Sequence, residues 1–279
     1  MFAFTYHRPD TLSQAVALLQ AREEAKPLAG GQTLIATLKQ RLAAPSDLVD
    51  LAALPDLRAI AREDGRLVIG AMARHADVEA SPLVRECLPA LAALAGMIGD
   101  PAVRNRGTLG GSIANNDPSA DYPAACLALA ATIVTDRREI PAADFFTGLF
   151  ETALEPDEIV VKVSFPLGGE GAYEKFRNPA SRYAMAGVFI WRGEAGPSEA
   201  STGESLVRVA VTGAGQGGVF RWAEAEAALA GAFCPAALEG LVLPADEMIE
   251  DIHGSGAYRA HLARAMARRA VARLMTAGA

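Results

Sequence analysis

A segment of about twenty residues, 99–121, interrupts an otherwise periodic chain with a run dominated by Gly, Asn, Asp, Ser and Pro. These residue types favour turns over regular helices and strands. Long ordered loops are uncommon in compact domains, and those that occur are usually functional. We therefore expect an irregular functional loop here, held by the periodic elements on either side.

The core of this segment, Arg106–Asp121, carries hydroxyls, amides and glycines but no histidine or cysteine. That inventory suits the binding of many oxygen atoms, as on a pyrophosphate and a ribitol chain, better than nucleophilic catalysis. A structural interpretation is also open, in which Asp117 or Asp121 caps the helix expected to follow. Capping and ligand binding can coexist.

A second glycine-rich turn, Leu28–Thr33, lies near the N-terminus. Residues 26–29 predict a strand, and apolar residues from Leu34 onward recur at helical spacing. A turn of this kind lets backbone N–H groups approach a phosphate closely, and the helix start adds roughly half a positive charge. Two glycines alone are more often a plain turn, so this motif by itself is weak.

The remaining periodicity predicts an α+β protein. The expected helices cover residues 11–21, 89–97, 121–131, 222–230 and 256–276, and the expected strands cover 47–51, 66–72, 158–165, 172–177, 184–192 and 206–212. A Gly-rich stretch, 167–171, predicts a domain boundary. The last three strands predict an antiparallel sheet, whose second and third strands are separated by a Gly- and Ser-rich stretch, 193–205.

Composition excludes several classes of function. A net charge of −7 argues against nucleic-acid binding, which needs clustered cations. No apolar run approaches the ~20 residues that span a bilayer, and the N-terminus lacks the order of a secretory signal, so we expect a cytoplasmic protein without a membrane span. One arginine-rich helix face predicts a solvated surface or, less often, an anion site: Arg264, Arg268, Arg269 and Arg273.

Neither cysteine nor histidine forms a metal-binding pattern. The cysteines are isolated from one another and predict free thiols: Cys87, Cys126 and Cys234. This chain therefore cannot hold a four-cysteine iron–sulfur cluster by itself. The histidines have no ligand spacing and are expected to be structural or exposed: His7, His75, His253 and His261. We expect no metal site.

One further motif, Gly213–Gly218, matches the G-x-G-x-x-G pattern of dinucleotide-binding folds and follows an expected strand. Too little chain follows it for two strand–helix–strand units, and no second parallel strand with a terminal acid is evident. We interpret it as a tight turn in the C-terminal sheet.

Taken together, the motifs resemble a known family. A-G-G-Q-T-L at 29–34, R-N-R-G-T-L-G-G-S-I-A-N-N-D-P-S-A-D-Y-P at 104–123 and D-I-H-G-S at 251–255 are similar to the FAD-binding medium subunit of the carbon monoxide dehydrogenase and xanthine dehydrogenase (molybdenum hydroxylase) family. The resemblance covers nearly the whole chain. One departure is Arg74, where relatives commonly carry a small hydroxyl residue.

The resemblance implies a vanillyl-alcohol-oxidase (PCMH) type FAD-binding domain, residues 1–168, with two α/β subdomains at about 1–55 and 56–168. A C-terminal α+β domain with a three-stranded antiparallel sheet follows at 172–279. It also implies a non-covalent FAD between the two subdomains. The implied contacts are Ala29, Gly30, Gly31, Gln32 and Thr33 in the first turn, Thr108, Gly110, Gly111 and Ser112 in the second, the Asp121 carboxylate, the apolar Val160, and Lys175 and Tyr183 near the isoalloxazine.

The same resemblance implies an electron relay without a catalytic acid or base in this chain. FAD would accept electrons from the [2Fe–2S] clusters of a small partner subunit, which are fed by a large molybdenum-cofactor subunit, in a dimer of heterotrimers. Two alternatives stay open: a free-standing FAD-dependent reductase of the same fold and a cofactor-free interaction domain. A core position for Tyr183 is a comparable alternative to a flavin contact.

Overall fold

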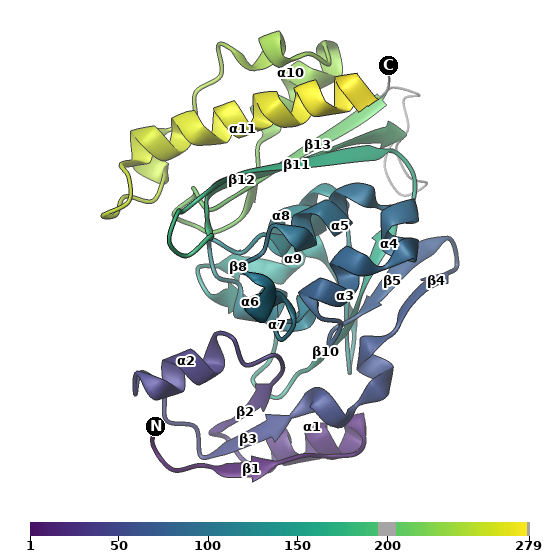
Figure 1. Cartoon of the computed structure of the whole chain (residues 1–279), viewed down its shortest axis with the longest axis vertical. Coiled ribbons are helices and arrows are strands. Elements are labelled where there is room, and N and C mark those ends of the chain that lie inside the picture. The colour runs from purple at the N-terminus through teal and green to yellow at the C-terminus, as the bar shows by residue number, and fades with distance from the viewer. Residues whose placement is uncertain (195–204, 278–279) are drawn as a thin grey trace.

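The computed structural model describes residues 1–194 and 205–277, which form three tiers, each built on its own sheet (Figure 1). Most of the predicted Gly- and Ser-rich stretch 193–205 lies outside the described residues. The tiers follow one another in sequence order. The N-terminal tier lies at one end of the molecule and the C-terminal tier at the other.

The first tier is a parallel sheet of strand order β1-β3-β2 with two helices. Its elements are β1 (Thr5–His7), α1 (Leu12–Gln20), β2 (Ala25–Leu28), α2 (Leu34–Lys39) and β3 (Asp47–Asp50). Thr11 caps α1 by accepting a hydrogen bond from the Gln14 N–H. The β2–α2 connection is the first glycine-rich turn, which therefore lies at the carboxyl end of a parallel strand.

The second tier is an antiparallel sheet of strand order β4-β5-β10-β6-β7, and most of its helices cover one face. Its strands are β4 (Ile60–Glu63), β5 (Arg66–Gly70), β6 (Thr132–Thr135), β7 (Glu139–Pro141) and β10 (Val160–Pro166), with a small hairpin of β8 (Phe146–Gly148) and β9 (Glu151–Thr152). Its helices are α3 (His75–Ala80), α4 (Pro82–Cys87), α5 (Pro89–Gly96), α6 (Pro101–Arg104), α7 (Leu109–Asn115), α8 (Tyr122–Ala128) and α9 (Ala142–Phe145). Two 3-10 turns, Leu51–Ala53 and Pro55–Arg58, connect the first tier to the second.

The third tier is an antiparallel sheet of order β11-β12-β13-β14. Its elements are β11 (Glu170–Arg177), β12 (Ala184–Glu194), β13 (Ser205–Thr212), β14 (Phe220–Arg221), α10 (Ala223–Gly231), two 3-10 turns (Pro235–Leu238 and Ala245–Glu247) and α11 (Gly256–Ala277). One face carries α11 and α10, and the other packs on α5 and α8 of the second tier. The sheet is thus buried on both faces, which agrees with the nearly unbroken burial of β12.

The α+β fold and the three long antiparallel C-terminal strands are confirmed, and β14 adds a fourth, two-residue strand. The expectation of an irregular segment from 99 to 121 is wrong, because α6 and α7 lie within it. Asp100 caps α6 ahead of a proline at its first position, and Thr108 caps α7. The strands β1, β4 and β6 to β9 were not predicted. The domain boundaries stay a prediction; the first two sheets lie within the predicted subdomains, whereas β11 begins at Glu170, two residues before the predicted C-terminal domain.

The Gly213–Gly218 motif is a turn, as predicted. It connects β13 to β14, and Gly213 has a positive φ of 78° that favours glycine.

The three cysteines are free thiols. The arginine-rich face of α11 is partly paired within the chain, because Arg268 contacts Glu239 and Arg273 contacts Glu174. In the described part of the chain, no helix has both the length and the apolar content to cross a membrane.

Candidate cofactor site

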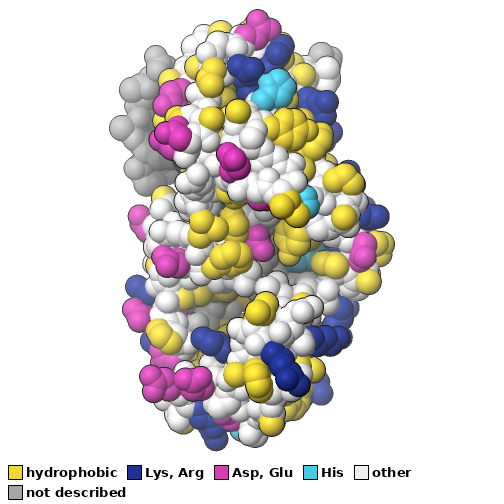
Figure 2. Space-filling model, turned by 90° about the vertical axis from the view of Figure 1, so that its left-hand side faces the viewer, with side chains coloured by type: hydrophobic (Ala, Val, Ile, Leu, Met, Phe, Trp, Pro, Cys, Tyr) yellow, Lys and Arg dark blue, Asp and Glu magenta, His cyan; other side chains and the backbone are white. Residues whose placement is uncertain are grey.

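A cleft of about 690 Å³ opens between the first and second tiers and reaches the start of the third. Its volume falls within the roughly 300–1,000 Å³ of typical ligand sites. The surface is visibly hollowed there, with hydrophobic side chains gathered nearby (Figure 2). Of the sequence-predicted site residues, these line the cleft: Ala29, Gly30, Gly31, Gln32, Thr33, Thr108, Gly110, Gly111, Ser112, Asp121, Val160 and Tyr183. Lys175 does not line it.

The first glycine-rich turn offers unused hydrogen-bond donors to the cleft. None of the backbone N–H groups of residues 30–33 donates a hydrogen bond to another described residue. Gly31 has a φ of 73°, which an L side chain rarely adopts. A Cβ on Gly30 would lie 2.1 Å from the Arg106 carbonyl oxygen, so the two turns meet there without room for a side chain. Free N–H groups in an open cleft are suited to the oxygens of a phosphate.

The second turn is held rigidly by the segment after β5. The Leu109 N–H donates to the Ala73 carbonyl at 3.0 Å, and the Gly110 N–H donates to the Ala71 carbonyl at 2.8 Å. Thr108 Oγ1 accepts from the Gly111 N–H at 3.1 Å. Thr108 is only 3% exposed although it borders the cleft, because its hydroxyl is turned inward to cap α7. The turn is therefore fixed before any ligand arrives.

Neither Asp117 nor Asp121 caps α8 with its side chain, so that structural interpretation is wrong: the Asp117 carboxylate accepts from the Ser119 N–H, ahead of the helix. The Asp121 carboxylate instead accepts hydrogen bonds from Tyr173 Oη at 2.5 Å and Lys175 Nζ at 3.0 Å. The Lys175 side chain is 1% exposed and also donates to the Met97 carbonyl at 3.2 Å. Burial raises the pKa of the Asp121 carboxyl, and the contacts with Lys175 and Tyr173 oppose that rise. Lys175 thus lies behind Asp121 in this structure.

Sequence reasoning missed Tyr173. Alternate residues of a strand share one face, so the placement of Lys175 in β11 already put Tyr173 beside it. Period-two spacing is therefore the signal that could have found it. Both side chains project from the third tier toward the start of α8, so the C-terminal sheet fixes a residue of the cleft wall.

Val160 and Tyr183 border the cleft from β10 and from the β11–β12 connection. The pairing of β10 with β6 shifts register between Val160 and Lys162, and such a bulge redirects side chains. Tyr183 is 47% exposed, which contradicts the core alternative. Its carbonyl accepts from the Asn178 N–H at 2.8 Å, so the connection is an ordered turn.

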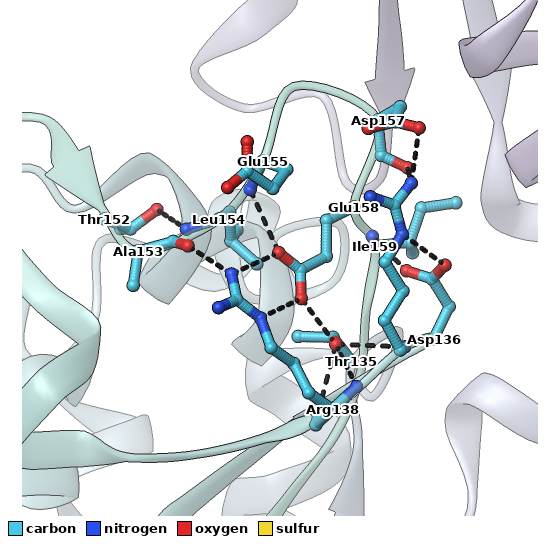
Figure 3. A network of polar contacts seen from close by, with 11 residues as sticks. Thr135, Asp136, Arg138, Thr152, Ala153, Leu154, Glu155, Asp157, Glu158 and Ile159 are labelled. Carbon is cyan, nitrogen blue, oxygen red and sulfur yellow. Dashed lines mark hydrogen bonds and ion pairs between the residues drawn. The ribbon is translucent and has the colours of Figure 1, made fainter.

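The third wall of the cleft, residues 152–159, is held by a polar network that sequence reasoning also missed (Figure 3). Arg138 donates to both carboxylate oxygens of Glu158, at 2.9 and 2.8 Å, and to the Ala153 carbonyl at 2.7 Å. Thr135 Oγ1 and the Glu155 N–H also donate to this carboxylate. The Arg138 guanidinium lowers the pKa of Glu158 to about 2, despite the opposing effect of burial. Nothing local in the sequence marks this pair, because 20 residues separate its members.

The donor set suits an organic cofactor. Backbone N–H groups, hydroxyls and the carboxylates of Asp117, Asp121, Glu155 and Glu158 border the cleft, whereas the described residues contain no group of three or more His, Cys, Asp or Glu that could hold a metal ion. The free N–H groups of the first turn, together with the second turn that Thr108 caps, suit the binding of a dinucleotide pyrophosphate. Apolar Val160 and aromatic Tyr183 are suited to contact a ring system.

Comparison with protein families matches residues 2–168 to the model described as "FAD binding domain in molybdopterin dehydrogenase". Among curated proteins, the chain is 37% identical to the carbon monoxide dehydrogenase medium chain of Hydrogenophaga pseudoflava, with 96% of each chain covered. It is 36% identical to the nicotine 6-hydroxylase medium subunit of Paenarthrobacter nicotinovorans, again with 96% of each covered.

Solved structures agree with these matches. The reconstituted carbon monoxide dehydrogenase from Oligotropha carboxidovorans superposes with a TM-score of 0.88 at 34% identity, over 97% of both chains. The quinoline 2-oxidoreductase from Pseudomonas putida 86 superposes with a TM-score of 0.83 at 30% identity, over 97% of this chain and 96% of that one. The predicted fold type, a PCMH-type FAD-binding domain followed by an α+β domain, is confirmed.

Proposed function

Because the chain belongs to the family of FAD-binding subunits of molybdopterin dehydrogenases, we propose that it is the electron relay of such an enzyme. In this role its FAD accepts electrons from [2Fe–2S] clusters of a partner subunit and passes them to an external acceptor. The chain is an oxidoreductase subunit with FAD as its cofactor. The observation that carries the proposal is the cleft, whose described lining offers free backbone donors and no group of three His, Cys, Asp or Glu that could hold a metal ion.

Within this proposal, the two glycine-rich turns bind the pyrophosphate. The N–H groups of residues 30–33 approach from one side and the Thr108–Ser112 turn approaches from the other. Each hydrogen bond to a charged group contributes about 1.5–3 kcal/mol, so several of them account for tight non-covalent binding. No covalent linkage is needed, since neither turn contains a histidine or cysteine.

Asp121 is the carboxylate contact of the cofactor in this proposal. Its orientation depends on Tyr173 and Lys175, which together occupy both of its oxygens. Lys175 therefore acts through Asp121, and its positive charge lies close to one end of the cofactor. Val160 and the exposed ring of Tyr183 provide an apolar edge and an aromatic face for the isoalloxazine.

FAD supplies the redox chemistry, and the residues of this chain bind it, orient it and exclude water. A relay needs no proton donor or acceptor positioned for a substrate. The molybdenum chemistry and the iron–sulfur clusters belong, in this proposal, to a large and a small partner subunit. We further propose a dimer of heterotrimers in the cytoplasm, without nucleic-acid partners.

A free-standing FAD-dependent reductase is the rival hypothesis. Such an enzyme needs arginines that bind its substrate beside the flavin, and among the described residues the cleft lining contains one arginine, Arg182. The Arg182 guanidinium donates a hydrogen bond to the Gly99 carbonyl at 3.5 Å, so it already has a partner within the chain. The relay hypothesis accounts for the sparse cationic lining better than the reductase hypothesis does.

The deciding experiment is purification of the tagged chain after co-expression with the genes of its natural neighbours. The relay hypothesis predicts that a yellow protein elutes with two other chains, one rich in iron and one containing molybdenum. A yellow chain that elutes alone and oxidises NAD(P)H with its own substrate would establish the reductase hypothesis. A colourless chain would leave the interaction domain as the remaining alternative.

A further inference from the structure

His75 has no role in the site described above, although it borders the cleft. It is the first residue of α3 and is 5% exposed. Its Nδ1 atom is enclosed without a hydrogen-bond partner in the described part of the chain. A buried imidazole nitrogen without a partner costs free energy, so such groups need a physical explanation.

The position of the ring ties it to both glycine-rich turns. The His75 N–H donates to the Gly107 carbonyl at 3.0 Å, which fixes the backbone at the entry to the second turn. A Cβ on Gly107 would lie 2.5 Å from Nε2, so the imidazole lies directly against that glycine. A Cβ on Gly30 would lie 2.8 Å from the Gly107 Cα. His75 thus lies where the two turns meet.

The His75 ring is neutral at physiological pH. Burial and the positive charge of Arg104 lower the pKa of His75 to about 4. A neutral imidazole presents one N–H donor and one acceptor nitrogen, and the tautomer follows whichever partner is available. It can therefore bond a phosphate or hydroxyl oxygen of a cofactor without carrying a charge of its own.

We propose that His75 is a further FAD-binding residue, whose neutral imidazole hydrogen-bonds the cofactor where the two glycine-rich turns meet. This inference rests on the proposed FAD site. The contact runs through Nε2, the ring nitrogen that is not enclosed, and it explains by one bond the packing of the ring on Gly107 and its place in the cleft lining. The enclosed Nδ1 and the Tyr122 hydroxyl, whose ring centroid is 5.4 Å away, fit a shared internal water instead, and such a water is the competing, purely structural role for this histidine.

The test compares FAD affinity in the full chain after removal of its flavin. His75→Phe keeps a planar ring of similar size but removes both nitrogens, and we expect FAD to bind about tenfold more weakly, equivalent to about 1.4 kcal/mol. Tyr122→Phe is the matched control, because it removes the neighbouring unpartnered atom but does not line the cleft. It should leave the FAD dissociation constant unchanged. Fluorescence quenching of added FAD measures both.

Two amide variants identify the nitrogen. His75→Asn places an amide near the position of Nδ1, and His75→Gln places one near Nε2, so His75→Gln should recover most of the affinity. In the unmodified chain, the ¹⁵N shifts of the His75 ring should move when FAD is added, which a purely structural role would not produce. This measurement also decides the matter if His75→Phe does not fold.

Equal FAD affinity in the chain with His75 and in His75→Phe, or ring shifts that FAD leaves in place, would overturn the inference. Failure of the unmodified chain to bind FAD at all is a different result, because it would contradict the proposed function itself.

Discussion

Gly111 provides the sharpest test of the pyrophosphate site. It lines the cleft, and a Cβ added there would meet only Thr108 Oγ1 at 2.9 Å and Ala29 Cβ at 3.5 Å. A valine therefore fits the fold at the cost of weakening the Thr108 cap, about 1 kcal/mol, which lowers the melting temperature by about 2–4 °C. Its branched side chain, however, occupies the space through which the pyrophosphate approaches the backbone.

The expected loss of binding is much larger than the loss of stability. If the side chain displaces the cofactor from two charge-assisted hydrogen bonds of about 1.5–3 kcal/mol each, affinity falls by at least about a hundredfold. We expect Gly111→Val to retain a cooperative melting transition and to lose its flavin. The assay is flavin content per folded chain, with the dissociation constant from fluorescence titration.

Gly110 is the matched control. A Cβ there would lie 2.5 Å from Ala71 Cβ and 2.8 Å from the Ala71 carbonyl oxygen, so Gly110→Ala has to disrupt the backbone that holds the turn. It should lose stability and flavin together, whereas Gly111→Val loses flavin alone. Normal flavin content in Gly111→Val would refute the reasoning and move the pyrophosphate elsewhere.

Three other predictions concern the walls and the chemistry of the site. The Glu158 pKa of about 2 lies below its ordinary value of 4.5, so the Arg138 pair stabilises the fold fully above pH 4.5 and loses this contribution as the pH falls toward 2. Glu158→Gln should therefore lower the free energy of unfolding by about 1–3 kcal/mol at pH 7 and by clearly less at pH 3, as measured by urea titration. An equal loss at both pH values would contradict the ion-pair account. Tyr183→Ala should weaken FAD binding about two- to tenfold, whereas the FAD affinity of Tyr183→Phe should be close to that of the unmodified chain. Equal FAD affinity in both variants and the unmodified chain would show that Tyr183 does not contact the cofactor. Acid precipitation should release the yellow colour into the supernatant, and colour retained by the pellet would show a covalent flavin.

Local sequence was sufficient for the two glycine-rich turns. Gly30 and Gly31 follow a strand and precede a helix, and that order is visible in a dozen residues. The helices α1, α8, α10 and α11 were predictable for the same reason, because apolar spacing and caps are local signals. The segment from 99 to 121 was misread because its composition outweighed the caps at Asp100 and Thr108.

Contacts between distant residues were beyond this reasoning. β10 pairs with β5 and β6, although about a hundred residues of chain separate β5 from β10 and no local pattern specifies the partner. Asp121 meets Lys175 across 54 positions, and Glu158 is held by Arg138 from another loop. The resemblance placed Asp121 and Lys175 at one cofactor, but only the fold shows that they form a buried ion pair.

The relay hypothesis is tested most directly by rapid-scan absorbance of the flavin in this subunit, alone and after addition of the iron–sulfur and molybdenum subunits. The account predicts that a hydroxylase substrate leaves the flavin of the isolated subunit oxidised and bleaches it once both partners are present. Flavin reduction by that substrate in the isolated subunit would contradict the relay, because this chain would then contain a substrate site of its own.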